Sequence, residues 1–194
     1  EDFRIDFEDG YGHRSDAEED GHARSAAAEL VEGFSRGALP PFIGIRIKPL
    51  STELCARSLR TLDLFISAAS QAGRPWYSSF VVTLPKVTNS AQVAALAKAL
   101  GLIEKKLRLP ARALKLELMI ETTQTLLSPG GAVALRGLAE AAQGRCSAAH
   151  FGTYDYTAAC DITAAYQEMT HPSCDFAKNI MQVAFAQTGI PLSD

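Results

Sequence analysis

The stretch "IGIRIKP", residues 43–49, places isoleucine at every second position, with Gly44, Arg46 and Lys48 between. Strict alternation of this kind is typical of a β-strand whose two faces have different surroundings. Phe3–Glu8 alternates in the same way. Strands buried in a parallel sheet normally read as continuous apolar runs. Buried charges of both signs are costly unless they are paired or bind something, so we expect a polar site at the ends of these strands.

Short strand patterns alternate along the whole chain with amphipathic helical patterns. This alternation predicts βαβ units and a parallel sheet, within one domain that covers residues 1–194. The predicted strands are Phe3–Glu8, Ile43–Ile47, Phe80–Leu84, Leu114–Ile120, Ala148–Phe151 and a short one within Ile190–Asp194. The predicted helices are Asp16–Phe34, Thr52–Ala72, one that begins near Asn89 or Ser90, Gly131–Ala142, Cys160–Met169 and Asp175–Gln187.

Such a sheet is either an open doubly wound sheet or a (β/α)8 barrel. No glycine-rich phosphate-binding motif follows a predicted strand, which removes the usual nucleotide-binding reason for an open sheet. A complete barrel needs ~250 residues, so 194 residues would form a partial barrel that lacks its first and last strands. We therefore expect that closure of the barrel needs residues outside this sequence.

Composition excludes several classes of partner. The formal net charge of −3 gives no reason to expect a nucleic acid or an anionic membrane as a partner. No apolar run approaches the ~20 residues that a membrane-spanning helix needs. The four cysteines and four histidines are scattered, without the clustered spacing of a zinc site. Reduced thiols and a cytoplasmic location are the plain expectation.

Two acidic residues follow consecutive predicted strands. Glu121 comes directly after one strand, and Asp155 follows the next one, beyond the glycine of "HFGTYDYTA" (residues 150–158). Adjacent strands lie ~4.8 Å apart, so both carboxylates can reach one small cation. Mg²⁺ favours one or two protein carboxylates together with water and substrate oxygens. The alternative is that Glu121 is a capping or ion-paired group and Asp155 an N-cap.

Arg46 is a second candidate, because it lies at the end of a strand on the charged face. A fixed guanidinium there can bind a carboxylate or the oxygen of a developing enolate. The alternative is a structural ion pair with Asp6 or Glu8. Lys86 also follows a strand, where we expect it to position other groups or to stabilise the fold, because no desolvated pocket for a Schiff base is apparent.

Five motifs in chain order resemble the HpcH/HpaI aldolase and citrate lyase beta-subunit family of the phosphoenolpyruvate/pyruvate superfamily. They are "RIDFEDGYG" (4–12), "GIRIKP" (44–49), "VVTLPKV" (81–87), "LELMIETTQ" (116–124) and "HFGTYDYTAA" (150–159). The resemblance implies a (β/α)8 barrel, here from its second strand to about its seventh. It also implies a homo-oligomer.

The resemblance implies a role for each site residue. Glu121 and Asp155 would bind Mg²⁺ or Mn²⁺, and Arg46 would hold the keto or enolate oxygen of the substrate. Two further pairs complete the implied site: Glu8 and Asp9 as catalytic support from the acidic turn, and Gly152 and Thr153 as backbone donors beside the substrate carboxylate. We further expect Gly152 to permit a backbone turn and close substrate approach, and nearby threonine and tyrosine hydroxyls to bond Asp155 or a metal-bound water.

The sequence thus predicts a metal-dependent carbon–carbon lyase or aldolase that acts on a 2-oxo acid or an acyl-CoA-type substrate. The cation and Arg46 would together stabilise the enolate that forms when the bond breaks. Two alternatives stay open: a non-catalytic barrel that binds a metabolite, and a hydrolase that uses the same metal site.

Overall fold

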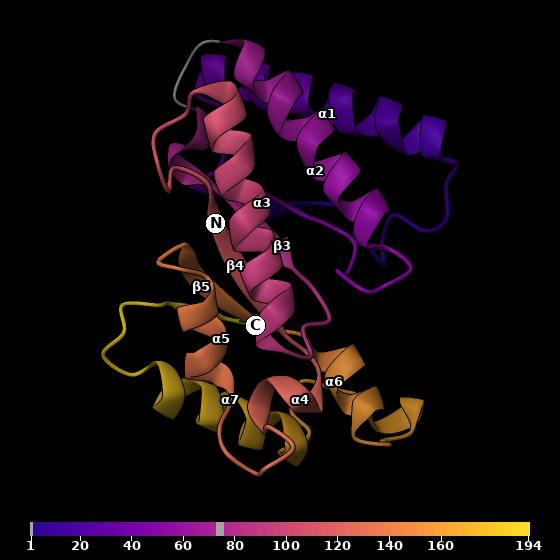
Figure 1. The fold of residues 1–194 in the computed structure, drawn as a ribbon. Coiled ribbons are helices and arrows are strands. Elements are labelled where there is room, and N and C mark those ends of the chain that lie inside the picture. Colours follow the sequence, from indigo (N-terminus) through magenta and orange to yellow (C-terminus); the bar gives the residue numbers. More distant parts are fainter. Residues whose placement is uncertain (1, 73–75) are drawn as a thin grey trace. The chain divides into compact units, whose positions relative to one another are not determined.

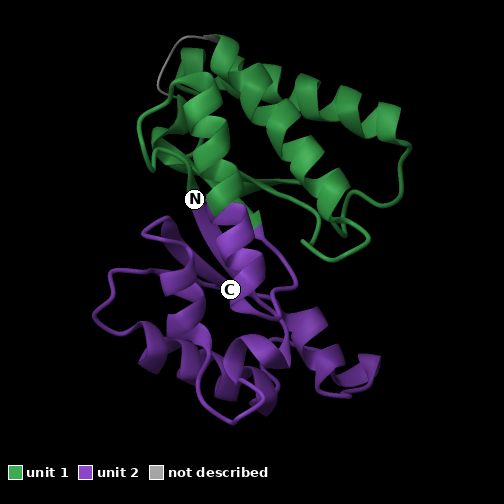
Figure 2. Cartoon of the chain, in the orientation of Figure 1, with its two compact units in different colours: residues 1–83, 98–115 green, residues 84–97, 116–194 purple. Residues whose placement is uncertain are grey.

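The computed structural model describes residues 2–72 and 76–194 (Figure 1). The chain divides into two compact units (Figure 2). Unit 1 consists of residues 1–83 and 98–115, and unit 2 consists of residues 84–97 and 116–194. The helix α3 (Ser90–Leu107) contributes residues to both units. As expected, it begins next to Asn89, whose side chain accepts a hydrogen bond from the backbone N–H of Gln92 at 3.2 Å.

Unit 1 contains parallel strands in chain order and the helices that connect them. The helices α1 and α2 pack on each other (Figure 1). The elements are β1 (Asp2–Asp6), α1 (Asp16–Arg36), β2 (Phe42–Arg46), α2 (Cys55–Ala69), the 3-10 helices η1 (Ser70–Ala72) and η2 (Trp76–Ser79), and β3 (Phe80–Leu84). The last residue of β3 belongs to unit 2.

The alternation in "IGIRIKP" is confirmed as a strand with one apolar face. Ile43, Ile45 and Ile47 are buried, whereas Arg46 keeps partial exposure. The strand β1 ends at Asp6, two residues earlier than predicted for Phe3–Glu8. The reason is local: the Asp6 carboxylate accepts hydrogen bonds from the backbone N–H groups of Glu8 and Gly10, so these residues form a turn and do not extend the strand.

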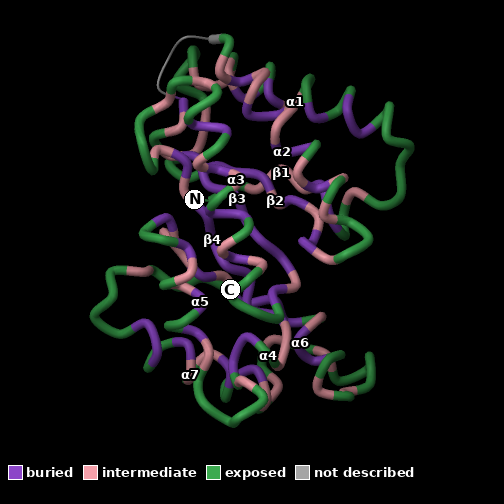
Figure 3. The backbone as a smooth tube through the Cα atoms, viewed as in Figure 1, coloured by how far each residue is buried: buried purple, intermediate pink, exposed green. Residues whose placement is uncertain are grey.

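The helix α1 begins and ends through standard capping chemistry. The Ser15 side chain accepts a hydrogen bond from the backbone N–H of Glu18, whose carboxylate accepts one from the N–H of Ser15. This reciprocal capping box satisfies two N–H groups that an α-helix leaves unpaired. At the other end Gly37 has a φ of 63°, the left-handed conformation that commonly ends a helix. Figure 3 shows how buried and exposed residues alternate along α1 and α2.

Unit 2 repeats the pattern with parallel strands in chain order. Both faces of β4 (Lys115–Ile120) are buried: Leu118 and Ile120 are fully buried on one face, and Glu117 on the other face is 2% exposed. The elements are β4 (Lys115–Ile120, from residue 116), α4 (Thr123–Leu126), α5 (Leu135–Ala141), β5 (Cys146–Phe151), α6 (Thr153–Ala159), the 3-10 helix η3 (Ala164–Tyr166), α7 (Pro172–Phe185) and β6 (Leu192–Ser193).

The predicted helix Cys160–Met169 is wrong. The helix α6 lies before it, and Cys160 is its C-cap. Asp161 then has a φ of 57°, which a continuing right-handed helix cannot contain. The residues that follow form only the short η3.

Other predicted helices differ at their first residues. The helix predicted at Gly131–Ala142 begins only at Leu135, because Gly131 has a φ of 80° and its N–H closes a turn onto the carbonyl of Ser128. The helix predicted from Asp175 begins at Pro172 instead, and the side chain of His171 caps it. Proline is favoured at a first helical position because its missing N–H needs no partner there.

Within residues 2–72 and 76–194, no helix combines the length and the apolar character needed to cross a membrane. All four cysteines are free thiols. Burial raises the pKa of the Cys146 thiol to about 11.

Candidate active site

Two groups of polar side chains lie at or just after the C-terminal ends of the parallel strands, one in each unit. The first, which we name the arginine cluster, consists of Asp6, Glu8 and Arg46 in unit 1. The second, the carboxylate cluster, consists of Lys86, Glu121 and Asp155 in unit 2. In barrel enzymes the catalytic residues come from this end of the strands.

In the arginine cluster, the guanidinium of Arg46 is fixed by a two-pronged ion pair. Arg46 ends β2, and Asp6, the last residue of β1, lies opposite it in the parallel register. Nε and Nη2 of Arg46 donate to the two carboxylate oxygens of Asp6, at 2.8 and 2.5 Å. Nη1 lies 3.7 Å from Oε2 of Glu8. A bidentate pair sets the plane of the guanidinium, so Arg46 makes the ion pair that was the alternative prediction, while its side chain stays 20% exposed.

The turn after β1 is shaped around the Asp6 carboxylate. The backbone N–H groups of Glu8 and Gly10 donate to its two oxygens at 2.9 and 2.8 Å. Burial by itself would raise the pKa of Asp6, but the hydrogen bonds from Arg46 and from these N–H groups, with the charge of Arg46, lower it overall. A Cβ at Gly10 would lie 2.6 Å from Oδ2 of Asp6, so this glycine leaves room for the carboxylate.

The two acidic residues predicted to support Arg46 have different surroundings. Glu8 is 8% exposed, and its Oε2 accepts the backbone N–H of Asp9 at 3.0 Å while facing Arg46. Asp9 is exposed. The catalytic roles of Glu8 and Asp9 stay predictions. Asp6 was predicted only as an alternative partner, although the pairing of two parallel strands that end together would have placed it opposite Arg46.

In the carboxylate cluster, Lys86 contacts both of the predicted metal ligands. Its backbone N–H donates to Oε1 of Glu121 at 2.6 Å, and its Nζ donates to Oδ2 of Asp155 at 3.2 Å. Glu121 is 1% exposed, whereas the side chains of Lys86 and Asp155 are 30% and 39% exposed. Lys86 has a φ of 48°, a left-handed conformation that costs a residue with a Cβ about 1–2 kcal/mol. No sequence pattern signals this conformation, so the double contact could not be predicted.

Gly152 makes room for the Glu121 side chain. Its N–H donates to the carbonyl of Ile120 at 3.0 Å, which holds it beside the end of β4. Its φ of −106° is open to any residue, so the predicted backbone turn is not the reason for a glycine here. A Cβ at this position would lie 2.7 Å from both Cβ and Oε2 of Glu121, and 3.0 Å from Cε of Met119. The glycine is therefore needed because Glu121 occupies the adjacent space.

Two of the hydroxyls around Asp155 have partners other than those predicted. Asp155 lies in the first turn of α6, whose N-cap is Gly152, so Asp155 is not itself the cap. The Thr153 hydroxyl donates to the sulfur of Met169 at 3.1 Å, and the Thr157 hydroxyl donates to the carbonyl of Thr153 at 2.8 Å. These two hydroxyls support the local fold. The substrate-binding role of the Gly152 and Thr153 backbone stays a prediction.

The carboxylate cluster fits a hard divalent cation in its donor chemistry. In the part of the chain that the structure describes, no three His, Cys, Asp or Glu side chains gather as a metal site. Two carboxylates, Glu121 and Asp155, agree with the one or two that Mg²⁺ usually takes, with water and substrate oxygens as further ligands.

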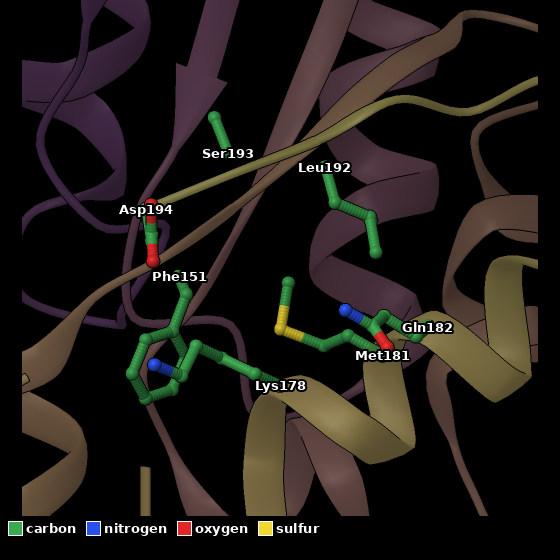
Figure 4. Close-up of a pocket in the computed structure, with 7 residues that line it drawn as sticks. All are labelled: Phe151, Lys178, Met181, Gln182, Leu192, Ser193 and Asp194. Carbon is green, nitrogen blue, oxygen red and sulfur yellow. The ribbon is translucent and has the colours of Figure 1, made fainter. Parts of the chain in front are cut away.

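Unit 2 also has a pocket of about 200 Å³ between α7 and the strands β5 and β6 (Figure 4). Figure 4 shows the Lys178 side chain extending from α7 toward Phe151. The lining residues are Phe151, Lys178, Met181, Gln182, Leu192, Ser193 and Asp194. None of the predicted site residues belongs to this set, so the pocket is separate from the carboxylate cluster.

Solved structures of malate synthase from Haloferax volcanii share the fold of this chain. The native enzyme at 3 mM glyoxylate matches with a TM-score of 0.74 and 15% identity, over 98% of this chain and 52% of that one. The pyruvate/acetyl-CoA ternary complex matches with a TM-score of 0.51 and 14% identity, over 90% and 54%. The magnesium/glyoxylate complex gives 0.52 and 12%, over 99% and 70%.

The chain thus spans 52% of the length of the first of these malate synthase structures. The similarity confirms the predicted fold: an α/β protein of the (β/α)8 type, in the form of a partial barrel. At this identity the similarity concerns the fold alone.

A search of proteins with curated functions gives no match. The narrower resemblance to the HpcH/HpaI aldolases stays a prediction. The family model that matches, over residues 1–194, is described as "Domain of unknown function (DUF6986)", and the chain belongs to this family.

Proposed function

We propose that this protein is a divalent-cation-dependent enzyme that makes or breaks a carbon–carbon bond beside a carbonyl group. Its substrate would be a 2-oxo acid or an acyl-CoA. The main support is the carboxylate cluster, in which Glu121 and Asp155, after the neighbouring strands β4 and β5, are both bonded to Lys86. The malate synthase structures of the same fold include complexes with magnesium, glyoxylate, pyruvate and acetyl-CoA, which favour the same chemistry.

Each residue has a defined task in this proposal. Glu121 and Asp155 would hold Mg²⁺ or Mn²⁺, which when bound would polarise the substrate carbonyl. Arg46, oriented by Asp6 and Glu8, would donate a hydrogen bond to the oxygen on which negative charge develops. This role for Arg46 rests on the sequence resemblance, which implies that it holds the keto or enolate oxygen of the substrate.

Two reaction classes pass through an enolate and would need these residues. A lyase or aldolase, which the sequence resemblance favours, releases an enolate when the carbon–carbon bond breaks. A condensing enzyme, which the malate synthase structures favour, forms an enolate when a proton leaves the carbon beside the carbonyl. Both need the same negatively charged oxygen to be stabilised, so formation of the enolate is the step to test. A homo-oligomeric state is a further prediction from the resemblance.

Exchange of substrate protons with D₂O tests the proposal. The wild-type protein with Mg²⁺ is expected to exchange the methyl protons of pyruvate or acetyl-CoA, measured by proton NMR, and EDTA should stop the exchange. Glu121→Gln and Asp155→Asn should reduce it by at least about 10²-fold, since they remove the charges proposed to hold the cation.

Equal exchange in all three proteins would count against the metal site. Binding of pyruvate without exchange would favour the metabolite-binding barrel, and thioester hydrolysis without exchange would favour the hydrolase.

A further inference from the structure

We infer that the ammonium group of Lys86 is a resident counter-cation of the carboxylate cluster, which a divalent cation displaces from Asp155 when it binds. The inference rests on the proposed metal site of Glu121 and Asp155. It adds that the side chain of Lys86 sets how tightly that site binds its cation. It concerns the side chain of Lys86, whereas the backbone of the same residue has a separate task.

The backbone of Lys86 fixes the residue at the site. Its N–H donates to Oε1 of Glu121 at 2.6 Å, and Glu121 is almost fully buried against Gly152. Hydrogen bonds to a charged acceptor are stronger than those between neutral groups. Since the left-handed conformation of Lys86 is unfavourable by itself, the contacts around this residue must hold it. The side chain therefore starts from a backbone that is held beside Glu121.

The ammonium meets Asp155 in a contact that is easily exchanged. Nζ lies 3.2 Å from Oδ2 of Asp155, and both side chains are about one-third exposed. A lysine presents a single charge on a flexible four-carbon stem, and it lacks the rigid fork that fixes an arginine on a carboxylate. Because solvent reaches the pair, the ammonium can leave Asp155 and be hydrated without a large loss of free energy.

A divalent cation and the ammonium compete for the same oxygen. Two nearby carboxylates repel each other, and a positive group beside one of them reduces that repulsion. A cation bound to Asp155 brings two positive charges to the place of the ammonium, and like charges at such short range repel each other strongly. Lys86 thus stabilises the cluster before the cation binds and lowers the apparent affinity for the cation by the strength of the contact that must break.

Calorimetric titration with Mn²⁺ tests this inference. Lys86→Met keeps the backbone N–H and an apolar stem of similar length but removes the charge. We expect it to bind Mn²⁺ about fivefold more tightly than the wild type, the ratio that corresponds to a partly exposed ion pair. Lys178→Met is the matched control, because Lys178 lies 3.3 Å from Asp175 with a side chain that is 27% exposed, and it belongs to no proposed site. Its affinity for Mn²⁺ should equal that of the wild type.

Thermal unfolding gives a second measurement that does not depend on the titration. In EDTA, Lys86→Met should unfold at a lower temperature than the wild type, because its carboxylates have lost the ammonium. Saturating Mn²⁺ should raise the unfolding temperature of Lys86→Met more than that of the wild type, since tighter binding stabilises the folded state more. If Lys86→Met does not fold, Lys86→Gln takes its place.

The outcomes separate this inference from the proposed function. If the wild type binds Mn²⁺, Asp155→Asn does not, and Lys86→Met binds with equal or lower affinity, the counter-cation is overturned while the metal site stands. If neither the wild type nor Lys86→Met binds Mn²⁺, with or without pyruvate, the metal site itself fails and the inference fails with it. Tighter binding by Lys86→Met but not by Lys178→Met supports the inference.

Discussion

The arginine cluster and the carboxylate cluster have the same formal composition but hold their basic side chains, Arg46 and Lys86, in different ways. Each combines two carboxylates with one basic side chain, a formal charge of −1. Arg46 makes two hydrogen bonds to Asp6, and Asp6 is itself fixed by two backbone N–H groups. Lys86 reaches Asp155 with one ammonium group, and both side chains are more exposed than those of Arg46 and Asp6.

This difference suggests a division of tasks. A guanidinium locked by a bidentate pair is a preorganised donor, which needs no rearrangement when negative charge develops near it. An ammonium whose contact with a carboxylate is accessible to solvent is suited to exchange with another cation. The arginine cluster should therefore respond to mutation through loss of orientation, and the carboxylate cluster through a change in which cation it holds.

The largest effect that this comparison predicts is for Gly152→Ala in the carboxylate cluster. The new methyl group would lie 2.7 Å from Cβ and Oε2 of Glu121, and Glu121 has little room to move because it is buried. Overpacking of this kind costs about 1–3 kcal/mol in the free energy of unfolding, measured by urea denaturation. Displacement of the carboxylate should also weaken Mn²⁺ binding in calorimetry.

Gly137→Ala is the matched control for that substitution. Gly137 lies within α5 of the same unit. Apart from its chain neighbours and the backbone of its own helix, no atom of the residues that the structure describes lies within 4 Å of the Cβ it would gain. Alanine there should raise the free energy of unfolding by about 0.5–1 kcal/mol, because glycine is unfavourable inside a helix. If the two variants had equal stability, the assignment of Gly152 as the space for Glu121 would be wrong.

The second prediction concerns orientation in the arginine cluster. Arg46→Lys keeps the charge but cannot bond both oxygens of Asp6 in one plane. We expect a loss of about 1 kcal/mol in the free energy of unfolding, because the pair is partly exposed. Proton exchange of pyruvate should fall by about 10²-fold, the scale for loss of one oriented donor. Unchanged exchange, measured by NMR as above, would make Arg46 a structural residue only.

The sequence was sufficient for the strands and for the type of fold. The alternation of apolar and polar residues in 43–49 shows directly which face of the strand packs on the core. The first and last residues of the helices in unit 2 were harder to predict from the sequence. The helix predicted at 160–169 is wrong because α6 ends at Ala159, with Cys160 as its C-cap, and Asp161 then has a left-handed conformation.

For the site, the sequence placed Glu121, Asp155 and Arg46 after strands but could not give their contacts. The role of Gly152 depends on a side chain 31 residues earlier, Glu121, that packs against it only after the strands β4 and β5 pair. The double contact of Lys86 depends on a backbone conformation that its residue type does not favour. Both are consequences of tertiary structure, which no local pattern contains.

The smallest predicted effect is the acid sensitivity of the arginine cluster. The pKa of Asp6 is lowered in the folded protein, because the hydrogen bonds from Arg46 and the backbone outweigh the effect of burial. A carboxyl whose pKa falls on folding stabilises the protein at pH values above its unfolded pKa of about 3.9, and this contribution disappears as the pH falls through the lower folded pKa.

Asp6→Asn has no such carboxyl. Urea denaturation at a series of pH values should therefore show the wild type more stable than Asp6→Asn at pH 7, with the difference shrinking below about pH 4. In the Arg46→Lys background the pH-dependent part of this difference should be smaller, because the arginine bond is the strongest cause of the lowered pKa. A difference between wild type and Asp6→Asn that stays constant down to pH 2 would show that Asp6 is not held by charge, and the contrast between a fixed arginine and an exchangeable lysine would lose its physical basis.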